Sequence, residues 1–392
     1  MNDMLAAIAA SQAIGAELIA FRRDLHLHPE LSFEESRTAA KVAEQLRAIG
    51  LACRTGVGGH GIVADIAGDR PGPIVALRAD MDALPIQEES GLPFASSTPG
   101  VMHACGHDAH TAILLGAARL LAANRGFAGT VRLLFQSAEE INAGAKAMIE
   151  AGALDGVAEI YGLHNLPTLS AGLAATRSGP MMGSVDRIEI DIEGRGAHGA
   201  IPDQGVDPIV CASAIVMALQ SIASRELSPF DPVVVTIGSL HAGDANNVIP
   251  HRAHLTGTVR TFHPRVQAEM EERIGRIVQR IAEGYRCDAQ LRYIRQVPVL
   301  SNHEAPVRHV NTVIEGVLGA ACLTEAAPTL AGEDFSVYLT HIPGCFFWLG
   351  SGPADNADQA CGLHHPKFTL QESCIPIGAA LLAEIASRRL SD

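Results

Sequence analysis

The sequence has few aromatic residues, a deficit of positive charge and no obvious long apolar segment. Aromatic residues make up 4% of the 392 positions, which is unfavourable for a pocket that stacks a large aromatic group. Acidic residues outnumber basic ones by 43 to 29, giving a net charge of -14; nucleic acid and anionic membranes are therefore unfavourable partners. We expect no segment long and apolar enough to span a membrane. Because 47% of the residues are hydrophobic and 18% charged, a globular protein is predicted.

The eight cysteines show no C-x-x-C pair and no regular spacing. Stapling disulfides are therefore not expected, and a reducing compartment fits. The Ala-rich start, Met1–Ala20, lacks a basic leading region and carries Gln12 and Glu17 inside its apolar run. This pattern predicts an amphipathic helix rather than a signal peptide. We therefore expect a cytoplasmic protein.

The length of the whole chain favours two domains over one. The first part of the chain alternates between helical and strand patterns. Ser32–Glu35 has the form of a capping box, which predicts a helix reaching Ile49 and ending at Gly50. Short β-rich runs and one long Ala/Leu-rich helix follow: strands 61–66, 74–77, 130–135 and 159–163, and a helix at 111–123. The alternation predicts an α/β domain, a mixed sheet covered by helices.

The middle of the chain has a different order of elements. The pattern predicts strand 184–192, helix 208–224, strands 232–239 and 253–261, helix 266–283 and strand 289–293. This β-α-β-β-α-β order is ferredoxin-like. A helix near 305–318 and an apolar run at 345–350 then resume the α/β pattern. We predict a catalytic domain in two pieces, 1–181 and 296–392, with an inserted α+β domain at 182–295.

Four polar clusters lie where strands end or where the long helix begins: Arg78–Asp82, Gln136–Glu140, His164-Asn165 and His103–His110. Ligands of open α/β sheets bind beyond the carboxyl ends of the strands. A lone Cys-x-His is usually a buried Cys beside a surface His, and two adjacent Glu residues usually form a solvated helix start. Together at consecutive strand ends, these Cys, His and Glu residues predict a site for a transition metal.

Several of these runs also resemble a known family, the M20 metallopeptidases, and within it the amidohydrolase branch of aminoacylases, hippurate hydrolases and auxin-conjugate hydrolases. The matching segments are residues 22–30, 78–85, 102–111, 136–140, 162–164, 196–198, 247–250, 257–261, 332–335 and 363–366. They follow the family order over almost the whole chain. The inserted domain is similar to the family's satellite domain, which implies a homodimer or higher homo-oligomer.

The resemblance also implies a role for individual residues. It implies two divalent ions per subunit, Zn²⁺ or Mn²⁺ with Co²⁺ and Ni²⁺ as alternatives, held by Cys105, His107, Glu140, His164 and His364. Glu139 would be the general base, and Asp82 belongs to the same catalytic set. His198, from the partner subunit by resemblance, would approach the scissile carbonyl. Asn247, Arg260 and Gly332 would contact the substrate, the first two through its carboxylate.

Some positions depart from the family pattern. Ser137 stands where Pro is frequent, and Ile141–Ala143 replaces a glycine-rich stretch directly after the predicted base and ligand. His365 stands beside the predicted ligand His364, at a position where Ser or Asn is common. The loop after Glu140 can change the shape of the pocket, so the identity of the acyl group stays open.

The predicted function is metal-dependent hydrolysis of the amide bond of small N-acyl amino acids of the N-acetyl or N-benzoyl type. The products would be a carboxylic acid and a free amino acid. The first alternative is a dipeptidase or carboxypeptidase of the same family. A non-catalytic metal-dependent binding protein is a further one, and so is a cysteine hydrolase that uses Cys105 as nucleophile and His107 as base.

Overall fold

The computed structural model describes residues 2–391, with side-chain burial given for residues 7–391. The chain divides into two compact units. Unit 1 consists of Met1–Met181, Ser301–Ala327 and Asp334–Asp392, and unit 2 of Met182–Leu300 and Pro328–Glu333. The end residues 1 and 392, which the predicted first helix and the predicted domain bounds include, lie outside the described residues. The catalytic and dimerisation roles assigned to the two parts stay predictions.

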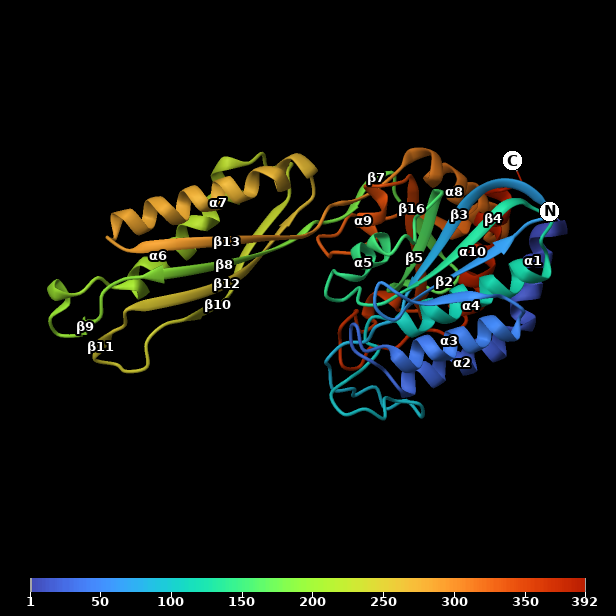
Figure 1. Ribbon diagram of the computed structural model, residues 1–392, viewed down its shortest axis with the longest axis horizontal. Coiled ribbons are helices and arrows are strands. Elements are labelled where there is room, and N and C mark those ends of the chain that lie inside the picture. The colour runs from blue at the N-terminus through green and yellow to red at the C-terminus, as the bar shows by residue number, and fades with distance from the viewer. Residues whose placement is uncertain (1, 392) are drawn as a thin grey trace. The chain divides into compact units, whose positions relative to one another are not determined.

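Unit 1 contains an eight-stranded mixed sheet in the order β1-β2-β4-β3-β5-β16-β6-β15 (Figure 1). Its strands are β1 (Cys53–Val57), β2 (Gly61–Ala67), β3 (Arg70–Asp80), β4 (Ala128–Gln136), β5 (Val157–Ser170), β6 (Ala174–Thr176), β15 (Leu323–Glu325) and β16 (Gly344–Gly352). The central pairs β4-β3, β3-β5 and β5-β16 are parallel, whereas β1-β2 and β2-β4 are antiparallel. The predicted mixed sheet is confirmed.

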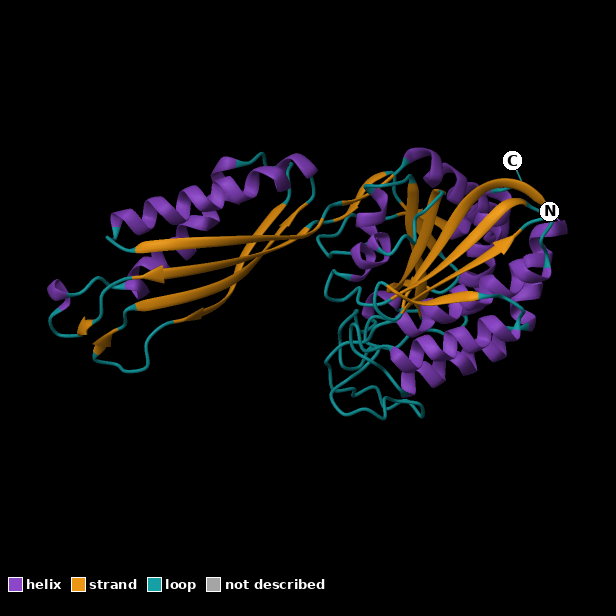
Figure 2. Ribbon diagram, in the orientation of Figure 1, coloured by secondary structure: helices purple, strands orange, loops and turns teal. Residues whose placement is uncertain are grey.

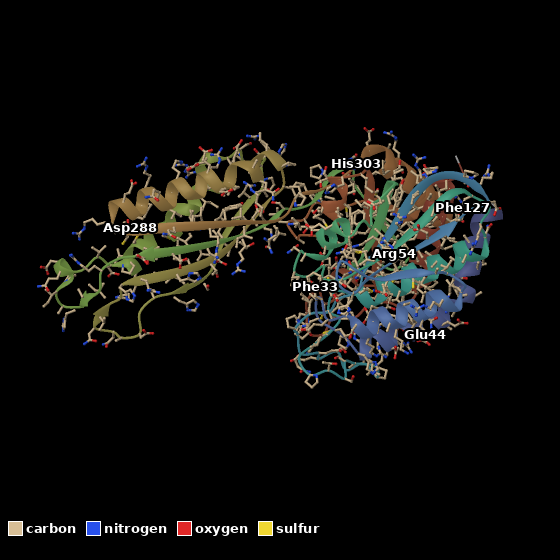
Figure 3. All side chains as sticks on the ribbon, viewed as in Figure 1. Phe33, Glu44, Arg54, Phe127, Asp288 and His303 are labelled. Carbon is tan, nitrogen blue, oxygen red and sulfur yellow. The ribbon has the colours of Figure 1, made fainter. Side chains whose placement is uncertain are left out.

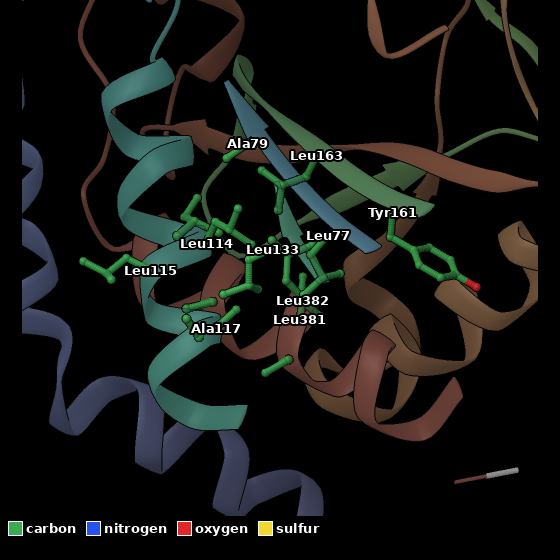
Figure 4. Close-up of a cluster of buried hydrophobic side chains, with 14 of the residues drawn as sticks. Leu77, Ala79, Leu114, Leu115, Ala117, Leu133, Tyr161, Leu163, Leu381 and Leu382 are labelled. Atoms are coloured by element: carbon green, nitrogen blue, oxygen red, sulfur yellow. The ribbon is translucent and has the colours of Figure 1, made fainter. Parts of the chain in front are cut away.

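Helices pack on both faces of this sheet. They are α1 (Asn2–Ala13), α2 (Gly15–Leu27), α3 (Ser36–Ala48), α4 (His107–Ala123), α5 (Gly144–Glu150), α8 (Glu304–Leu318), α9 (Phe335–Leu339) and α10 (Cys374–Arg389). Figure 4 shows side chains of α4 and α10 meeting Leu77, Leu133 and Leu163 of the sheet. Gly162, the neighbour of Leu163, points to the other face, where Phe335 of α9 comes so close that a Cβ would lie 2.8 Å from its ring.

Unit 2 contains a four-stranded antiparallel sheet in the order β10-β12-β8-β13. Its elements are β8 (Val185–Glu193), α6 (Pro208–Ser221), β10 (Val233–His241), β12 (Arg252–Thr261), α7 (Pro264–Gly284) and β13 (Asp288–Val297). Every second residue of β8, Ile188, Ile190 and Ile192, is fully buried in a core shared with α6 and α7. This is the predicted ferredoxin-like arrangement.

The short elements complete the two units. β9 (Ala197–His198) pairs with β11 (Val248–Ile249), and β7 (Gly179–Met182) pairs with β14 (Leu300–Asn302). Four further helical turns are η1 (Pro202–Gln204), η2 (Ile222–Glu226), η3 (Ala320–Cys322) and η4 (Ala357–Gln359). The sequence pattern missed these short pieces, and also β1, β6, β15, α5, α9 and the long helix α10.

Three local predictions are wrong. The predicted first helix is two helices, because the chain leaves helical geometry at Ile14 (φ -98°, ψ 0°). The capping box does not form, because Ser32 and Glu35 bind other partners. The carboxylate of Glu30 instead accepts the first N–H groups of α3, those of Arg37 and Thr38. By length and composition one helix, Pro208–Glu226, is apolar enough to cross a membrane. A core helix of a globular protein passes the same test, so this single helix is weak evidence for a membrane span.

Candidate metal centre

The predicted ligands gather at the carboxyl end of the central parallel strands. β3 ends at Asp80 and β4 at Gln136, and loops collect at this end of the sheet (Figure 2). α4 starts there at His107, directly after Gly106, which has φ 87°. A Cβ at Gly106 would lie 2.3 Å from Nδ2 of Asn165. Glycine is therefore required where the helix begins against β5.

Five side chains form what we call the metal-ligand cluster: Cys105, His107, Glu140, His164 and His364. One group of ligand atoms, all within 4.8 Å of one another, comes from Cys105, His107 and His164, and a second comes from Cys105, Glu140 and His364. Sγ of Cys105 is 3.4 Å from Nε2 of His164. Oε2 of Glu140 is 3.4 Å from Nε2 of His364. Because Cys105 belongs to both groups, it is positioned to be shared by two ions.

His107 and His164 each use Nδ1 for a contact outside the cluster, so that Nε2 of each ring faces the other ligand atoms. Nδ1 of His164 donates to the carbonyl oxygen of Asn165 at 2.8 Å, so Nε2 carries the lone pair. Nδ1 of His107 lies 3.2 Å from Oδ1 of Asp82. Nε2 of His107 and Oε1 of Glu140 are buried without a hydrogen-bond partner. Orphaned polar atoms of this kind are explained by a bound cation, so these residues fit a metal site.

The electrostatics of the cluster also call for a cation. Burial lowers the pKa of His107, but Asp80, Asp82 and Glu140 outweigh burial and raise it to about 10. Burial and neighbouring carboxylates raise the pKa of the Cys105 thiol well above its usual value. The site therefore attracts a positive charge and disfavours a bare thiolate. A metal ion satisfies both conditions, because it replaces the proton on His107 and stabilises the Cys105 thiolate.

Asp82, predicted as part of the catalytic set, acts on the cluster through its neighbours. Its Oδ2 accepts hydrogen bonds from Oγ of Ser32 at 2.7 Å and from the backbone N–H of Glu140 at 3.0 Å. Burial raises the pKa of Asp82, but hydrogen bonds from His107, Ser32 and Glu140 outweigh burial and lower it. The ionised Asp82 therefore orients the imidazole of His107 and holds the backbone at Glu140.

Glu139, the predicted general base, lies in a turn that, together with the start of α5, is held by three buried carboxylates. Glu35 accepts the N–H of Ala138 at 2.8 Å, Asp82 accepts that of Glu140, and Asp334 accepts that of Ala145 at 2.9 Å. The backbone N–H of Asp334 also donates to Oε1 of Glu139 at 3.3 Å.

Two residues of this turn, Ala138 and Asn142, have positive φ angles of 56° and 58°. Such backbone strain persists only where surrounding contacts fix it. The predicted site did not include Glu35 and Asp334, because no local pattern tells which distant carboxylate binds a turn.

A second buried network adjoins the metal-ligand cluster, where Oδ2 of Asp80 lies 3.8 Å from Nε2 of His107. Its residues belong to the polar clusters Arg78–Asp82 and His103–His110, but their contacts with one another were not predicted. Oδ1 of Asp80 lies 2.6 Å from Nδ1 of His110, and Oδ2 lies 2.6 Å from Nη1 of Arg78. Nε2 of His110 accepts the backbone N–H of Asn165 at 2.9 Å. Two adjacent histidines, His364 and His365, were candidates for the last metal ligand. It is the ring of His364 that lies in the metal-ligand cluster, and the backbone of His364 has φ 64°.

The remaining predicted site residues lie in unit 2. His198 and Asn247 are exposed neighbours across the β9-β11 pair, where the N–H of Gly199 donates to the carbonyl oxygen of Asn247 at 2.7 Å. Arg260 lies half-buried on β12. A Cβ at Gly332 would come within 2.1 Å of Val185, so packing alone accounts for the glycine there. The substrate roles of these four residues stay predictions.

Comparison with known proteins identifies relatives along nearly the whole chain. Residues 76–388 match the model of peptidase family M20/M25/M40. An N-acetyl-L-cysteine deacetylase of Bacillus subtilis is 43% identical, with 95% of this chain and 88% of the relative covered. A thermostable carboxypeptidase of Saccharolobus solfataricus is 38% identical, with 94% of each covered. An IAA-amino acid hydrolase of Arabidopsis thaliana is 38% identical, with 96% and 87% covered.

A solved structure shares both the sequence pattern and the fold. It is that of a dinuclear metal binding peptidase of Bacillus subtilis, which is 39% identical to this chain. The TM-score is 0.84, and the alignment covers 97% of this chain and 99% of the other.

Proposed function

Because the chain belongs to peptidase family M20/M25/M40 and is therefore a metal-dependent hydrolase, we propose that it cleaves the amide bond of small N-acyl amino acids. The observation that carries the proposal is the metal-ligand cluster with Glu139 beside it: ligand atoms of His107, Glu139 and Glu140 lie within 4.8 Å of one another. A relative is named for deacetylating N-acetyl-L-cysteine and another for hydrolysing IAA-amino acids, which supports this substrate class.

The metal-ligand cluster would hold two divalent ions, which would polarise the amide carbonyl and lower the pKa of a water molecule. Glu139 takes a proton from that water and passes it to the leaving amine. Its neighbour Glu140 also belongs to the group with Cys105 and His364, whereas Glu139 does not, so we assign Glu140 as the ligand and Glu139 as the base. The hydrogen bond from the N–H of Asp334 keeps Oε1 of Glu139 in place for both transfers.

We assign recognition of the substrate to residues of unit 2. His198, contributed by the partner subunit of a homodimer, donates to the oxyanion, where a well-placed donor is worth about 3 kcal/mol. Asn247 and Arg260 bind the carboxylate of the amino acid, since the guanidinium fork matches both oxygens. Gly332 contacts the substrate through its backbone. These assignments rest on the resemblance to the family.

The test is release of free amino acid by protein that is stripped with a chelator and then resupplied with Zn²⁺, Mn²⁺, Co²⁺ or Ni²⁺. N-acetyl and N-benzoyl amino acids are compared with dipeptides. We expect activity to return with metal and kcat to fall by about a hundredfold or more in Glu139→Gln, because the base is lost. Metal content of that variant should stay at two ions per subunit.

Glu150→Gln is the matched control, since Glu150 is exposed on α5 and forms an ion pair with the exposed Lys146. Its activity should equal that of the unaltered protein. Full activity of Glu139→Gln would contradict the assignment of the base, and inert substrates with two ions bound would favour the non-catalytic binding protein. Activity that resists the chelator but not a thiol reagent would favour the cysteine hydrolase, which the raised pKa of Cys105 already opposes.

A carboxypeptidase or dipeptidase is the second candidate, because one relative is named a thermostable carboxypeptidase. The two activities differ in the group next to the scissile carbonyl, which is an acyl chain in one case and an amino acid in the other. A kcat/KM at least about tenfold higher for an unblocked dipeptide than for its N-acyl analogue would favour the second candidate, a difference of about 1.4 kcal/mol.

We further propose a cytoplasmic homodimer. Eight cysteines without framework spacing fit a reducing compartment. Ile209, Val210 and Met217 of α6 expose apolar side chains on unit 2, which is the part expected to dimerise. Light scattering and cell fractionation test these two points.

A further inference from the structure

Two large apolar side chains stand out on unit 1. Among its described side chains, those of residues 7–391, the large hydrophobic residues that are exposed are Phe33 at 38% and Ile141 at 50%. Single exposed hydrophobic residues are common on protein surfaces and need no explanation. These two residues lie 108 positions apart in the chain, yet both flank residues that hold the metal-ligand cluster in place. Their common location calls for a functional explanation.

Phe33 is fixed between two residues that bind the centre. Ser32 donates to Asp82, and Glu35 accepts from Ala138. Phe33 itself has φ 63°, a conformation that is costly for an aromatic residue. Its ring packs against Gly59, where a Cβ would lie 2.7 Å from Cδ1 of Phe33. Figure 3 shows Phe33 on the loop-rich side of unit 1.

Ile141 is fixed in the same way from the other direction. It directly follows the ligand Glu140 and precedes Asn142, whose φ is 58° and whose N–H donates to the carbonyl oxygen of Glu139 at 2.7 Å. The side chain of Ile141 therefore projects from the turn that carries the predicted base Glu139 and the ligand Glu140. A Cβ at Gly59, which would touch the ring of Phe33, would also lie 3.8 Å from Cβ of Ser137, so the ring of Phe33 lies close to the segment that leads into this turn.

The chemistry of the two side chains indicates which part of the substrate can lie against them. Phe33 and Ile141 carry neither a charge nor a side-chain hydrogen-bond donor, so they offer no partner to the carboxylate of an amino acid. The acyl group of an N-acyl amino acid carries no charge. An apolar acyl chain that covers the phenyl group of Phe33 and the sec-butyl group of Ile141 binds more tightly. Each buried methylene raises the affinity by up to about fourfold.

Resting on the proposed function, we propose that Phe33 and Ile141 form an apolar subsite beside the metal centre that binds the acyl group. The subsite selects aliphatic acyl chains longer than acetyl. The two residues determine specificity, whereas Glu139 and the metal ligands carry out the chemistry.

The test is the affinity of metal-loaded protein for the product acids acetate, butanoate and hexanoate, measured by titration calorimetry. In the unaltered protein we expect the affinity to rise by about twofold to fourfold per added methylene. In the double variant Phe33→Ala/Ile141→Ala this dependence on chain length should disappear. Tyr285→Ala is the matched control, because Tyr285 is an exposed aromatic residue (42%) of unit 2, and it should keep the dependence.

An affinity that does not change with chain length in the unaltered protein would overturn the subsite, as would a double variant with an unchanged dependence. Cleavage of N-acetyl and N-hexanoyl amino acids is measured in parallel and tests the proposed function by itself. If affinity rises with chain length but neither compound is cleaved, the proposed function fails and the apolar subsite stands. If both are cleaved without any dependence on chain length, the function stands and the subsite fails.

Discussion

Two buried charged clusters begin at the same point of the chain and differ in how their charges are matched. His107 faces the metal-ligand cluster, and the next residue, Asp108, faces a second cluster of Arg22, His26 and Glu88. Nε of Arg22 lies 2.6 Å and Nδ1 of His26 lies 2.8 Å from Oδ2 of Asp108. Nε2 of His26 lies 3.1 Å from Oε1 of Glu88. In this Arg22 cluster each carboxylate lies within 3.1 Å of a basic side chain, although Nε of Arg22 makes an ion pair without a well-formed hydrogen bond. In the metal-ligand cluster, Oε1 of Glu140 and Nε2 of His107 have no hydrogen-bond partner.

The difference separates a structural cluster from a functional one. Paired buried charges stabilise the fold by their mutual contacts, and removing one partner is costly. Unpaired polar atoms destabilise the protein until a ligand arrives, so they are tolerated where a ligand binds. The first turn of α4 therefore contributes to both clusters. Asp108 joins the Arg22 cluster, which holds the helix in place, and His107 joins the metal-ligand cluster.

The largest expected effect comes from removing a ligand, in Glu140→Gln. Activity should fall by about a thousandfold or more, because a divalent ion that stabilises transition-state charge is lost or misplaced. The metal-free variant should unfold at nearly the same urea concentration as the metal-free parent, since Oε1 of Glu140 has no hydrogen-bond partner to lose and lies 3.8 Å from Nε2 of His107, its ion-pair partner. Elemental analysis and urea titration check the two statements. Marked destabilisation of the metal-free variant would show that the two clusters do not differ as described.

The second effect concerns stability, in Asp108→Asn. We expect a loss of about 3 to 5 kcal/mol, because the buried guanidinium of Arg22 would lose its carboxylate partner at 2.6 Å and keep the more distant Glu372 at 3.4 Å. Urea unfolding of chelator-treated protein measures this loss directly, without any contribution from metal binding. Refolded Asp108→Asn should still bind two ions, since its neighbour His107 points to the other cluster. A stable variant that had lost its metal would reverse the assignment of the two clusters.

The sequence predicted what regular patterns determine. Short β-rich runs predicted most strands of the two larger sheets and the ferredoxin-like order, and strand ends located the polar clusters. The pattern at Ser32–Glu35 gave the wrong structure, because a capping box is a local motif and both side chains instead bind residues far away in the chain. Short edge strands such as β6 and β15, each of three residues, give too little periodicity to be recognised.

The residue types of the candidate centre were also readable, whereas their supports were not. Cys, His and Glu at strand ends indicate a metal whatever the fold, since few other roles need that combination. Glu35 and Asp334 were missed because each binds a backbone N–H more than 100 residues away, at separations of 103 and 189. Such partners follow from tertiary packing alone.

The smallest expected effect tests the Arg22 cluster through pH, in His26→Gln. Burial lowers the pKa of His26, but the charge of Asp108 and hydrogen bonds to Asp108 and Glu88 outweigh burial and the nearby Arg22 and raise it. The stabilising effect of His26 is therefore fully present below its ordinary value of 6.5 and is lost as pH rises through the raised pKa. At about pH 5.5 the variant should lose about 2 kcal/mol, the typical value of a hydrogen bond to a charged group, and the loss should shrink toward about pH 9. Urea unfolding at both pH values measures it. A loss that grew with pH would mean that His26 is held neutral, and the Arg22 cluster would then contain an unmatched carboxylate like those that face the metal.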